Sequence, residues 1–255
     1  MNKICKQPPR KWVGGVLQEG CDNERGHGSR SIVLKIGGSL LAQPAWVGRV
    51  STLIDFLLDS GQVPTIVVGG GAIADGMRRI DATSAAAPAL VHDLAIGCMT
   101  ITARLVARLI GLPIVFEPPC DCAAVLDIEH WLASRQGVGL PASWDVTSDS
   151  IAASVAGHPP DVRSTLVLVK SVPPPLDAMG AGPSLTSLAD AGWVDRYFPV
   201  AARRLRVEWF APSSASLPEP ARFGSLGESL RPDVSQVGRF DGVGDHGPGL
   251  GENAS

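Results

Sequence analysis

The fold is decided by two stretches, Ile32-Val33-Leu34-Lys35-Ile36-Gly37-Gly38-Ser39 and Thr65-Ile66-Val67-Val68-Gly69-Gly70-Gly71. In each, a short apolar run rich in β-branched residues leads into glycines, and a helical pattern begins after them. Such runs are typical of buried parallel strands, so both glycine turns are expected at the carboxyl edge of one sheet, where α/β folds bind ligands. Glycine lets a backbone approach a phosphate closely, and a helix N-terminus supplies free N–H groups. The pair of turns therefore predicts two anionic groups, a donor and an acceptor.

Strands and helices alternate through the rest of the folded region, which favours an α/β fold with a mostly parallel sheet covered on both faces. After the first turn we expect a helix from Trp46 that Gly61 ends. The further expected elements are a strand at 64–68, helices at 72–80 and 89–110, a strand at 114–116, a helix at 123–134, a loop at 137–141, a helix that begins within 147–150, and a central strand at 165–169 that ends at Lys170.

The composition favours one folded domain that acts on small molecules. The chain has 255 residues, of which 45 % are hydrophobic, and a net charge of −3 with dispersed Lys and Arg. We therefore expect no nucleic acid and no membrane as partner. The apolar stretches are expected to be too short to span a bilayer, and the N-terminus lacks the apolar run of a secretory signal. The protein is accordingly expected to be cytoplasmic.

Two terminal segments differ in composition from the middle of the chain. Residues 1–30 mix Pro, Gly and charge without periodicity, and residues 211–255 are rich in Pro, Gly and Ser, so both are expected to be disordered tails around a domain at 31–210. The five cysteines are odd in number and irregularly spaced, which predicts reduced thiols. Cys120 and Cys122 lack a second pair with ligand spacing, so no metal site is expected.

Two charged residues stand where chemistry is expected. Lys35 comes at the end of the first predicted strand, so its ammonium group is directed at the ligand of the turn, or else it is an ordinary solvated lysine. Asp149 heads a predicted helix, where it is either an N-cap or a functional carboxylate. Gly69 to Ala74 also satisfy a loose dinucleotide fingerprint, but the acidic residue expected about twenty positions later is Asp93, inside a helix. Neither turn has P-loop spacing.

The motifs taken together resemble the amino-acid kinase superfamily, which includes kinases for acetylglutamate, glutamate, aspartate, carbamate, uridylate and isopentenyl phosphate. The resemblance rests on Lys-x-Gly-Gly-Ser at 35–39, Gly-Gly-Gly at 69–71, and Thr-Ser-Asp-Ser-Ile-Ala-Ala at 147–153 ahead of a buried strand. It implies a three-layer αβα sandwich that binds ATP and a carboxylate or phosphate acceptor side by side, with Mg²⁺ as cofactor. A homo-oligomer is also expected.

The resemblance also implies roles for single residues. Lys35 would bridge the donor and acceptor phosphoryl oxygens, and Asp149 would orient the active-site lysines. Gly37, Gly38 and Ser39 would wrap the donor, and Gly69, Gly70 and Gly71 would form the acceptor turn. The second lysine that several relatives carry in a Gly-Gly-x-x-x-Lys segment is missing, so Lys170 is the expected replacement, with Ser171 beside the donor; a solvated strand end is the alternative for Lys170.

One branch is similar in more detail: the kinases that phosphorylate an aminomethyl-furanmethanol phosphate on the route to methanofuran. The features are Val-His-Asp-Leu-Ala-Ile-Gly-Cys-Met at 91–99, Leu-Val-Lys-Ser-Val at 168–172, and Gly-Trp-Val-Asp-Arg-Tyr-Phe at 192–198. His92 is then a candidate for gripping the acceptor, and Trp131 or Trp144 for a pocket wall, although a satisfied helical His and core Trp residues are the alternatives. The resulting hypothesis is an ATP-dependent kinase of a small phosphorylated acceptor. A carboxylate, carbamate or UMP kinase, a non-catalytic binding or storage protein, and a nucleotide-dependent oxidoreductase remain open.

Overall fold

A parallel sheet of six strands forms the centre of the computed structural model, which describes residues 32–84, 86–118, 122–134, 139–159, 164–172 and 183–211. The strand order is β3-β4-β2-β1-β5-β6. The strands are β1 (Ile32–Ile36), β2 (Pro64–Val68), β3 (Ile114–Val115), β4 (Ala124–Leu126), β5 (Thr165–Val169) and β6 (Arg206–Phe210). The helices are η1 (Gly38–Ala42), α1 (Trp46–Asp59), α2 (Gly71–Asp81), α3 (Pro88–Ile110), α4 (Ile128–Ser134), α5 (Ser148–Ala156), α6 (Leu185–Asp190) and α7 (Phe198–Ala201).

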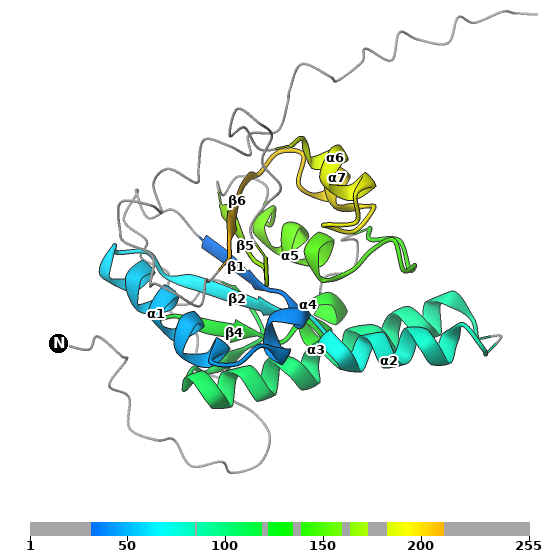
Figure 1. The fold of residues 1–255 in the computed structure, drawn as a ribbon, viewed down its shortest axis with the longest axis horizontal. Helices are drawn as coiled ribbons and strands as arrows, with labels where there is room; N and C mark the ends of the chain where they lie inside the picture. Colours follow the sequence, from blue (N-terminus) through cyan, green and yellow to red (C-terminus); the bar gives the residue numbers. More distant parts are fainter. Residues whose placement is uncertain are drawn as a thin grey trace, which may run out of the picture.

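Helices cover both faces of the sheet, which confirms the predicted α/β sandwich of three layers. Figure 1 shows α1 and α3 on one side of the strands, and α5, α6 and α7 on the other. Successive residues of a strand point to opposite faces, so each strand contributes to both cores. In β1, for example, Val33 lies in the core beneath α5 to α7, whereas Leu34 lies in the core beneath α1.

Most predicted elements are present, and one prediction is wrong. Residues 123–134, expected as one helix, form strand β4 followed by the short helix α4. The strand pairs with β2 and β3, and its buried position outweighs the helical preference of its Ala and Leu residues. Asp127 separates the two elements, and its carboxylate accepts a hydrogen bond from the N–H of His130 at 3.1 Å, which caps α4. No element was predicted after residue 170, where α6, α7 and β6 are found.

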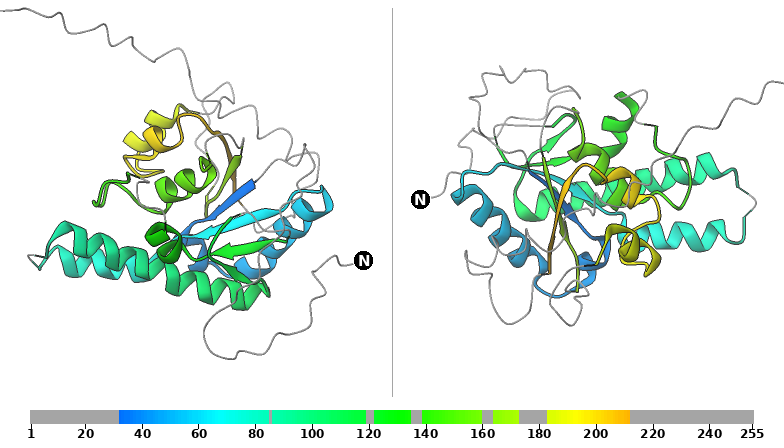
Figure 2. Two further views of the ribbon diagram at one scale, coloured as in Figure 1. Left: turned by 180° about the vertical axis from the view of Figure 1, so that it is seen from behind. Right: turned by 90° about the horizontal axis from the view of Figure 1, so that it is seen from above.

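Helix α3 is the longest helix of the described chain, with 23 residues. By length and composition it is apolar enough to cross a membrane, which corrects the expectation that every apolar stretch is too short. One of its faces packs on the sheet and on neighbouring helices as part of both cores. Together with α2 it forms a helical hairpin that projects beyond the sheet (Figures 1 and 2). The predicted tail at 1–30 lies outside the described residues, and so does the predicted tail at 211–255 apart from residue 211. The loop predicted at 137–141 is described only from residue 139, where it has no helix or strand.

Candidate active site

The two glycine turns lie against each other at the carboxyl edge of the sheet. Strands β1 and β2 are parallel neighbours in register, with Ile36 opposite Val68, so their turns emerge side by side. A Cβ atom added to Gly38 would lie 2.3 Å from both the N and the Cα of Gly71. Gly71 itself has a φ of +55°, a backbone conformation that favours glycine. This close backbone contact explains why both turns consist of glycine.

Behind the turns, one carboxylate holds two ammonium groups. The Nζ of Lys35 lies 2.7 Å from Asp149 Oδ1, and the Nζ of Lys170 lies 2.7 Å from Asp149 Oδ2. The side chains of Lys35, Asp149 and Lys170 are 4 %, 7 % and 13 % exposed. The three come from strand β1, the first turn of α5 and the residue after β5, which are far apart in sequence and meet at one sheet edge. The structure thus brings together the three residues that the sequence analysis selected as catalytic.

The electrostatics of this group follow from its burial. Burial by itself would raise the pKa of Asp149, but the ammonium groups of Lys35 and Lys170 outweigh it and hold that pKa below its usual value. Burial and the neighbouring charge of Lys35 lower the pKa of Lys170 to about 8, against the opposing effect of Asp149. With both lysines protonated the group carries one net positive charge, which a bound anion would neutralise.

Asp149 does not cap its helix, contrary to one of the predicted alternatives. The N-cap of α5 is Thr147, whose side chain makes no capping hydrogen bond. The carboxylate of Asp195 caps the helix instead: its Oδ2 accepts hydrogen bonds from the N–H groups of Thr147 and Ser150, both at 3.0 Å, and from the Thr147 hydroxyl at 2.9 Å. The Ser150 hydroxyl donates to its Oδ1. Because Asp195 satisfies the helix terminus, the Asp149 carboxylate is available to both lysines.

The residues predicted to hold a donor phosphate gather between β1 and β5. The N–H of Gly37 donates to the carbonyl of Val169 at 2.9 Å, which joins the two strand ends. Beyond it, the hydroxyls of Ser39 and Ser171 lie 3.3 Å apart. Gln43 also reaches this point, since its Nε2 donates to the carbonyl of Ser171 at 3.3 Å. The predicted donor residues are therefore neighbours in space although Ser39 and Ser171 are 132 positions apart.

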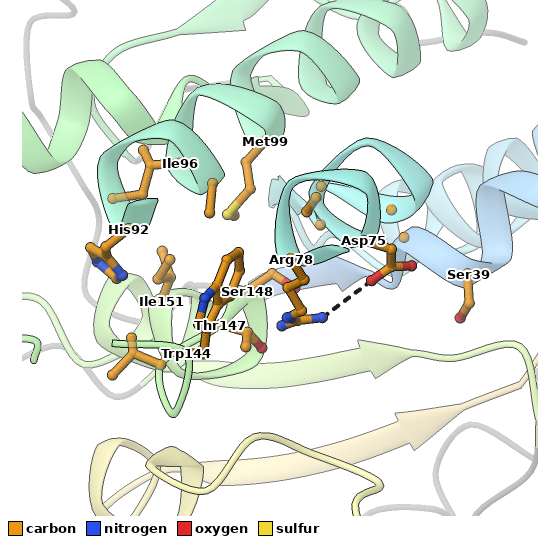
Figure 3. A pocket seen from close by; sticks show the side chains of 17 residues that line it. Ser39, Asp75, Arg78, His92, Ile96, Met99, Trp144, Thr147, Ser148 and Ile151 are labelled. Carbon is orange, nitrogen blue, oxygen red and sulfur yellow. Dashed lines mark hydrogen bonds and ion pairs between the residues drawn. The ribbon is translucent and has the colours of Figure 1, made fainter. Parts of the chain in front are cut away.

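On the other side, the glycine turns open into a pocket of about 220 Å³ between α2, α3 and α5 (Figure 3). Its lining residues are Gly38, Ser39, Gly69, Gly70, Gly71, Ala74, Asp75, Arg78, His92, Ala95, Ile96, Met99, Trp144, Val146, Thr147, Ser148 and Ile151. His92 and Trp144 are thus placed in the pocket, as the sequence analysis considered. Trp131 is not: its side chain is fully buried in the core, which was the alternative for it.

The sequence analysis missed Arg78, a cationic side chain that lines the pocket beside Trp144. Its guanidinium lies 4.6 Å from the centre of the Trp144 ring and 3.1 Å from the carboxylate of Asp75. Trp144 is held in turn by its indole N–H, which donates to Asp81 at 2.8 Å. The spacing offered a signal: Arg78 lies seven residues after Gly71, two turns along α2, and therefore on the same side of the helix as the glycine turn.

The polar groups of this site are suited to anions. The described residues contain no group of three or more His, Cys, Asp or Glu side chains that could hold a metal ion. They do contain glycine backbone at two helix starts, since neither η1 nor α2 has a side-chain cap. Chemically, the site is suited to holding and stabilising negative charge at the lysines, next to a pocket with one guanidinium and an aromatic wall.

Comparisons with known proteins agree with this geometry. Residues 30–126 match the family model described as "Amino acid kinase family". The chain is similar to a [5-(aminomethyl)furan-3-yl]methyl phosphate kinase from Methanocaldococcus jannaschii, with 28 % identity over 148 residues. The match covers 53 % of this chain and 63 % of the relative, so it spans less than two thirds of that protein's length.

Two solved structures share the fold. A UMP kinase from Bacillus anthracis superposes with a TM-score of 0.56 at 15 % identity, covering 80 % of this chain and 97 % of that one. An aspartate kinase from Synechocystis superposes with a TM-score of 0.52 at 16 % identity, covering 74 % of this chain and 38 % of that one. The chain therefore matches the amino acid kinase family over residues 30–126 and shares the fold of α/β layers with these solved kinases.

Proposed function

We propose that the protein is a cytoplasmic, ATP-dependent phosphotransferase whose acceptor is a small phosphate monoester. An anionic oxygen of the acceptor phosphate forms a bond to the γ-phosphorus of ATP, the bond from that phosphorus to the β,γ-bridging oxygen breaks, and the products are ADP and a diphosphate. The observation that carries the proposal is the group formed by Lys35, Asp149 and Lys170 beside a pocket that ends on the Gly69–Gly71 turn.

The lysine group explains how the chain would promote transfer. In phosphoryl transfer, charge is spread over the equatorial oxygens of the moving group, and fixed cations stabilise it. Two ammonium groups close together repel each other, and the carboxylate of Asp149 between them reduces this repulsion and fixes both positions. No general base is required, because the attacking oxygen of a phosphate acceptor is already anionic.

Mg²⁺ would reach this site on the nucleotide. Magnesium in kinases is held largely by the phosphates of the substrate. This agrees with the described residues, which contain no group of three or more His, Cys, Asp or Glu side chains that could hold a metal ion. When bound, the ion screens the negative charge of the phosphates. The chain's own contribution is the pair of lysines, the glycine N–H groups, and the hydroxyls of Ser39 and Ser171 on the donor side.

The pocket supports an acceptor with a phosphate at one end and a small flat body. The backbone N–H groups of Gly70 and Gly71 and the guanidinium of Arg78 suit a phosphate, and Trp144, Met99 and Ile151 supply apolar walls. The first candidate is therefore [5-(aminomethyl)furan-3-yl]methyl phosphate, the substrate in the name of the relative from Methanocaldococcus jannaschii. Methanofuran-type cofactor synthesis would be the corresponding pathway.

A panel of acceptors tests this proposal. Purified protein is supplied with Mg·ATP and with the furan phosphate, acetylglutamate, aspartate, carbamate or UMP, and ADP release is measured. We expect the furan phosphate to give the highest kcat/KM. Preference for one of the other four would transfer the assignment to a different kinase of the same fold. ATP binding without acceptor-dependent ADP release for any of them would favour a non-catalytic binding protein.

Arg78 is expected to set the affinity for the acceptor phosphate. Arg78→Met removes a charged hydrogen-bond donor from the pocket, and such bonds contribute about 1.5–3 kcal/mol, so the KM for the acceptor should rise about 10- to 100-fold. The KM for ATP should change little, because Arg78 lies on α2, the helix that begins at the predicted acceptor turn. Arg79→Met is the matched control, since Arg79 is its exposed neighbour and does not line the pocket. Equal effects of the two substitutions would contradict the assignment.

The rate is expected to fall at alkaline pH because of Lys170. Its pKa of about 8 means that the ammonium loses its proton as the pH rises past that value, and the lysine group then changes from one net positive charge to none. The kcat/KM for ATP should therefore be level below pH 8 and decline above it with the loss of one proton. A bound anion favours the protonated form, so the decline of kcat should begin at higher pH.

Two variants identify the titrating group. Lys170→Met should lower kcat/KM below pH 8 and abolish the alkaline decline, so that the variant and the wild type approach each other at high pH. Lys170→Arg, whose guanidinium stays charged, should move the decline upward. An unchanged alkaline decline in Lys170→Met would assign the titration to another group.

A further inference from the structure

The short segment Gly192-Trp193-Val194-Asp195 contacts the lysine group but has no part in the proposed transfer. It follows α6, where the N–H groups of Gly192 and Trp193 donate to carbonyls of the last turn at 3.0 and 2.9 Å. Gly192 has a φ of +74°, so these two bonds form the glycine-terminated helix end that turns the chain sharply. Val194 is only 5 % exposed and anchors the segment in the core beneath α5 to α7. The helix end and the buried valine thus fix the course of this segment.

The segment and strand β6 provide a second set of contacts to Lys170. Its Nζ donates to the carbonyl of Trp193 at 3.0 Å, in addition to its 2.7 Å contact with Asp149. The ring of Trp209 lies 5.6 Å from the same Nζ, a distance suited to a cation–π interaction. The indole N–H of Trp209 donates to the carbonyl of Val172 at 3.0 Å, and the rings of Trp193 and Trp209 meet edge to face. Lys170 is therefore held by α5, by β6 and by the chain that follows α6.

Asp195 links these contacts to Asp149. Its carboxylate accepts hydrogen bonds from the backbone and the hydroxyl groups of Thr147 and Ser150, which stand on either side of Asp149 in the chain. Because these bonds fix the backbone before and after Asp149, they fix the point from which its carboxylate reaches the lysines. Trp193 is two positions before Asp195. One short segment thus holds both Asp149 and Lys170.

Asp195 also adds a negative charge to the surroundings of Lys170. Among the described residues, the charged groups that act on Lys170 are Lys35 of β1, Asp149 of α5 and Asp195. Burial and Lys35 lower the pKa of Lys170, whereas Asp149 and Asp195 raise it. Loss of the charge of Asp195 should therefore lower the pKa of Lys170 further, below about 8.

We infer that Asp195 is a positioning residue of the lysine group, which holds Asp149 through the start of α5 and, with the neighbouring Trp193 carbonyl, holds Lys170 in place as a cation. Asp195 acts through these residues and does not itself touch the reacting atoms. Its effect on the rate rests on the proposed phosphoryl transfer. Its effect on Lys170 rests on the geometry alone and can be measured without turnover.

Two substitutions separate the charge of Asp195 from its hydrogen bonds. Asp195→Asn offers an amide oxygen to the N–H groups of Thr147 and Ser150 and an NH₂ group to the Ser150 hydroxyl, so the cap is retained and the charge is lost. We expect the pKa of Lys170 to fall below about 8, and the alkaline decline of kcat/KM for ATP to move to lower pH with it. Asp195→Ala also removes the cap, so kcat should in addition fall about 10- to 100-fold, the cost of a small displacement of reacting groups, while the KM for ATP changes less.

NMR of the lysine side chains measures the pKa of Lys170 directly. With ¹³C at lysine Cε, the signal of Lys170 is identified by its absence in Lys170→Arg. The spectrum is simple because the chain has only five lysines: Lys3, Lys6, Lys11, Lys35 and Lys170. Ser150→Ala is the matched control, since it removes one hydrogen bond to Asp195 and leaves the charge in place, so the pKa of Lys170 should stay at its wild-type value.

The outcomes distinguish this inference from the proposed function. An unchanged pKa of Lys170 in Asp195→Asn, an equal fall of that pKa in Ser150→Ala, or a wild-type kcat in Asp195→Ala would overturn the inference. Circular dichroism checks the fold of each variant, and Asp195→Asn decides the test if Asp195→Ala does not fold. A wild type without turnover whose Lys170 still responds to Asp195→Asn as expected would contradict the proposed function and support the positioning of Lys170 by Asp195.

Discussion

Lys35→Met is expected to lower kcat by about two to three orders of magnitude, the loss that follows removal of a fixed electrostatic stabiliser. The side chain of Lys35 is almost fully buried, and its ammonium group is held 2.7 Å from Asp149, so its charge has a fixed position. Methionine retains most of the length and apolar volume of the lysine stem. ATP affinity, measured by calorimetry, should fall far less than kcat, because glycine N–H groups and Lys170 still bind the phosphates.

Asp149→Asn is expected to reduce the rate to a similar extent by a different route. The amide keeps the shape of the side chain but removes the charge that holds Lys35 and Lys170 at 2.7 Å on either side. The two ammonium groups then repel each other and lose their positions. The helix terminus should be unaffected, because Asp195 and not Asp149 caps α5. We therefore expect Asp149→Asn to lower the rate of phosphoryl transfer while the cap of α5 stays intact.

The double variant shows whether the two residues act as one unit. Since both serve the same transition state, Lys35→Met with Asp149→Asn should lose much less activity than the product of the single losses. Single-turnover rates and kcat for the four proteins complete the cycle. Asp55→Asn, on an exposed position of α1, is the control and should retain full activity. Multiplicative effects, or near-normal turnover in either single variant, would mean that the residues are not catalytic.

Substitutions in the glycine turns are expected to have the second largest effect, on folding as well as on rate. Gly38→Ala places a Cβ atom 2.3 Å from backbone atoms of Gly71, and backbone at the end of a buried strand cannot move away cheaply. Gly71→Ala places a side chain on a left-handed backbone conformation, which costs about 1–2 kcal/mol. Its Cβ atom would also lie 3.1 Å from the carbonyl oxygen of Gly38. We expect each to lower the free energy of unfolding by about 2–4 kcal/mol and to abolish most activity.

A glycine in the same helix provides the comparison. Gly76 lies inside α2, and an added Cβ atom there meets nothing within 4 Å. Gly76→Ala should therefore raise the free energy of unfolding by up to about 1 kcal/mol, through the better helix propensity of alanine, and leave turnover intact. Urea denaturation and steady-state rates of the three variants test both effects. A Gly38→Ala protein as stable and active as the wild type would show that the turns do not need to touch.

The sequence by itself determined the layered α/β fold and the position of the phosphate-binding edge. The apolar runs at 64–68 and 165–169 are long, β-branched and bounded by turn residues, so the strands were predicted with the bounds that the structure shows. Lys35 and the glycines follow such runs directly, and local pattern suffices to place them at a strand end. The first strand extends one residue beyond Lys35, to Ile36, which does not change that placement.

Only the tertiary structure decided which distant residues meet. Strand β4 is short and rich in Ala and Leu, so its strand state depends on pairing with β2 and β3, which no local pattern records. Asp195 caps α5 from 45 residues away, which relieved Asp149 of that role. The pocket residue Arg78 likewise owes its position to Trp144, brought to α2 by the chain that follows β4. Contacts between segments far apart in sequence depend on how the whole chain packs. The sequence next to either partner therefore does not show which contacts form.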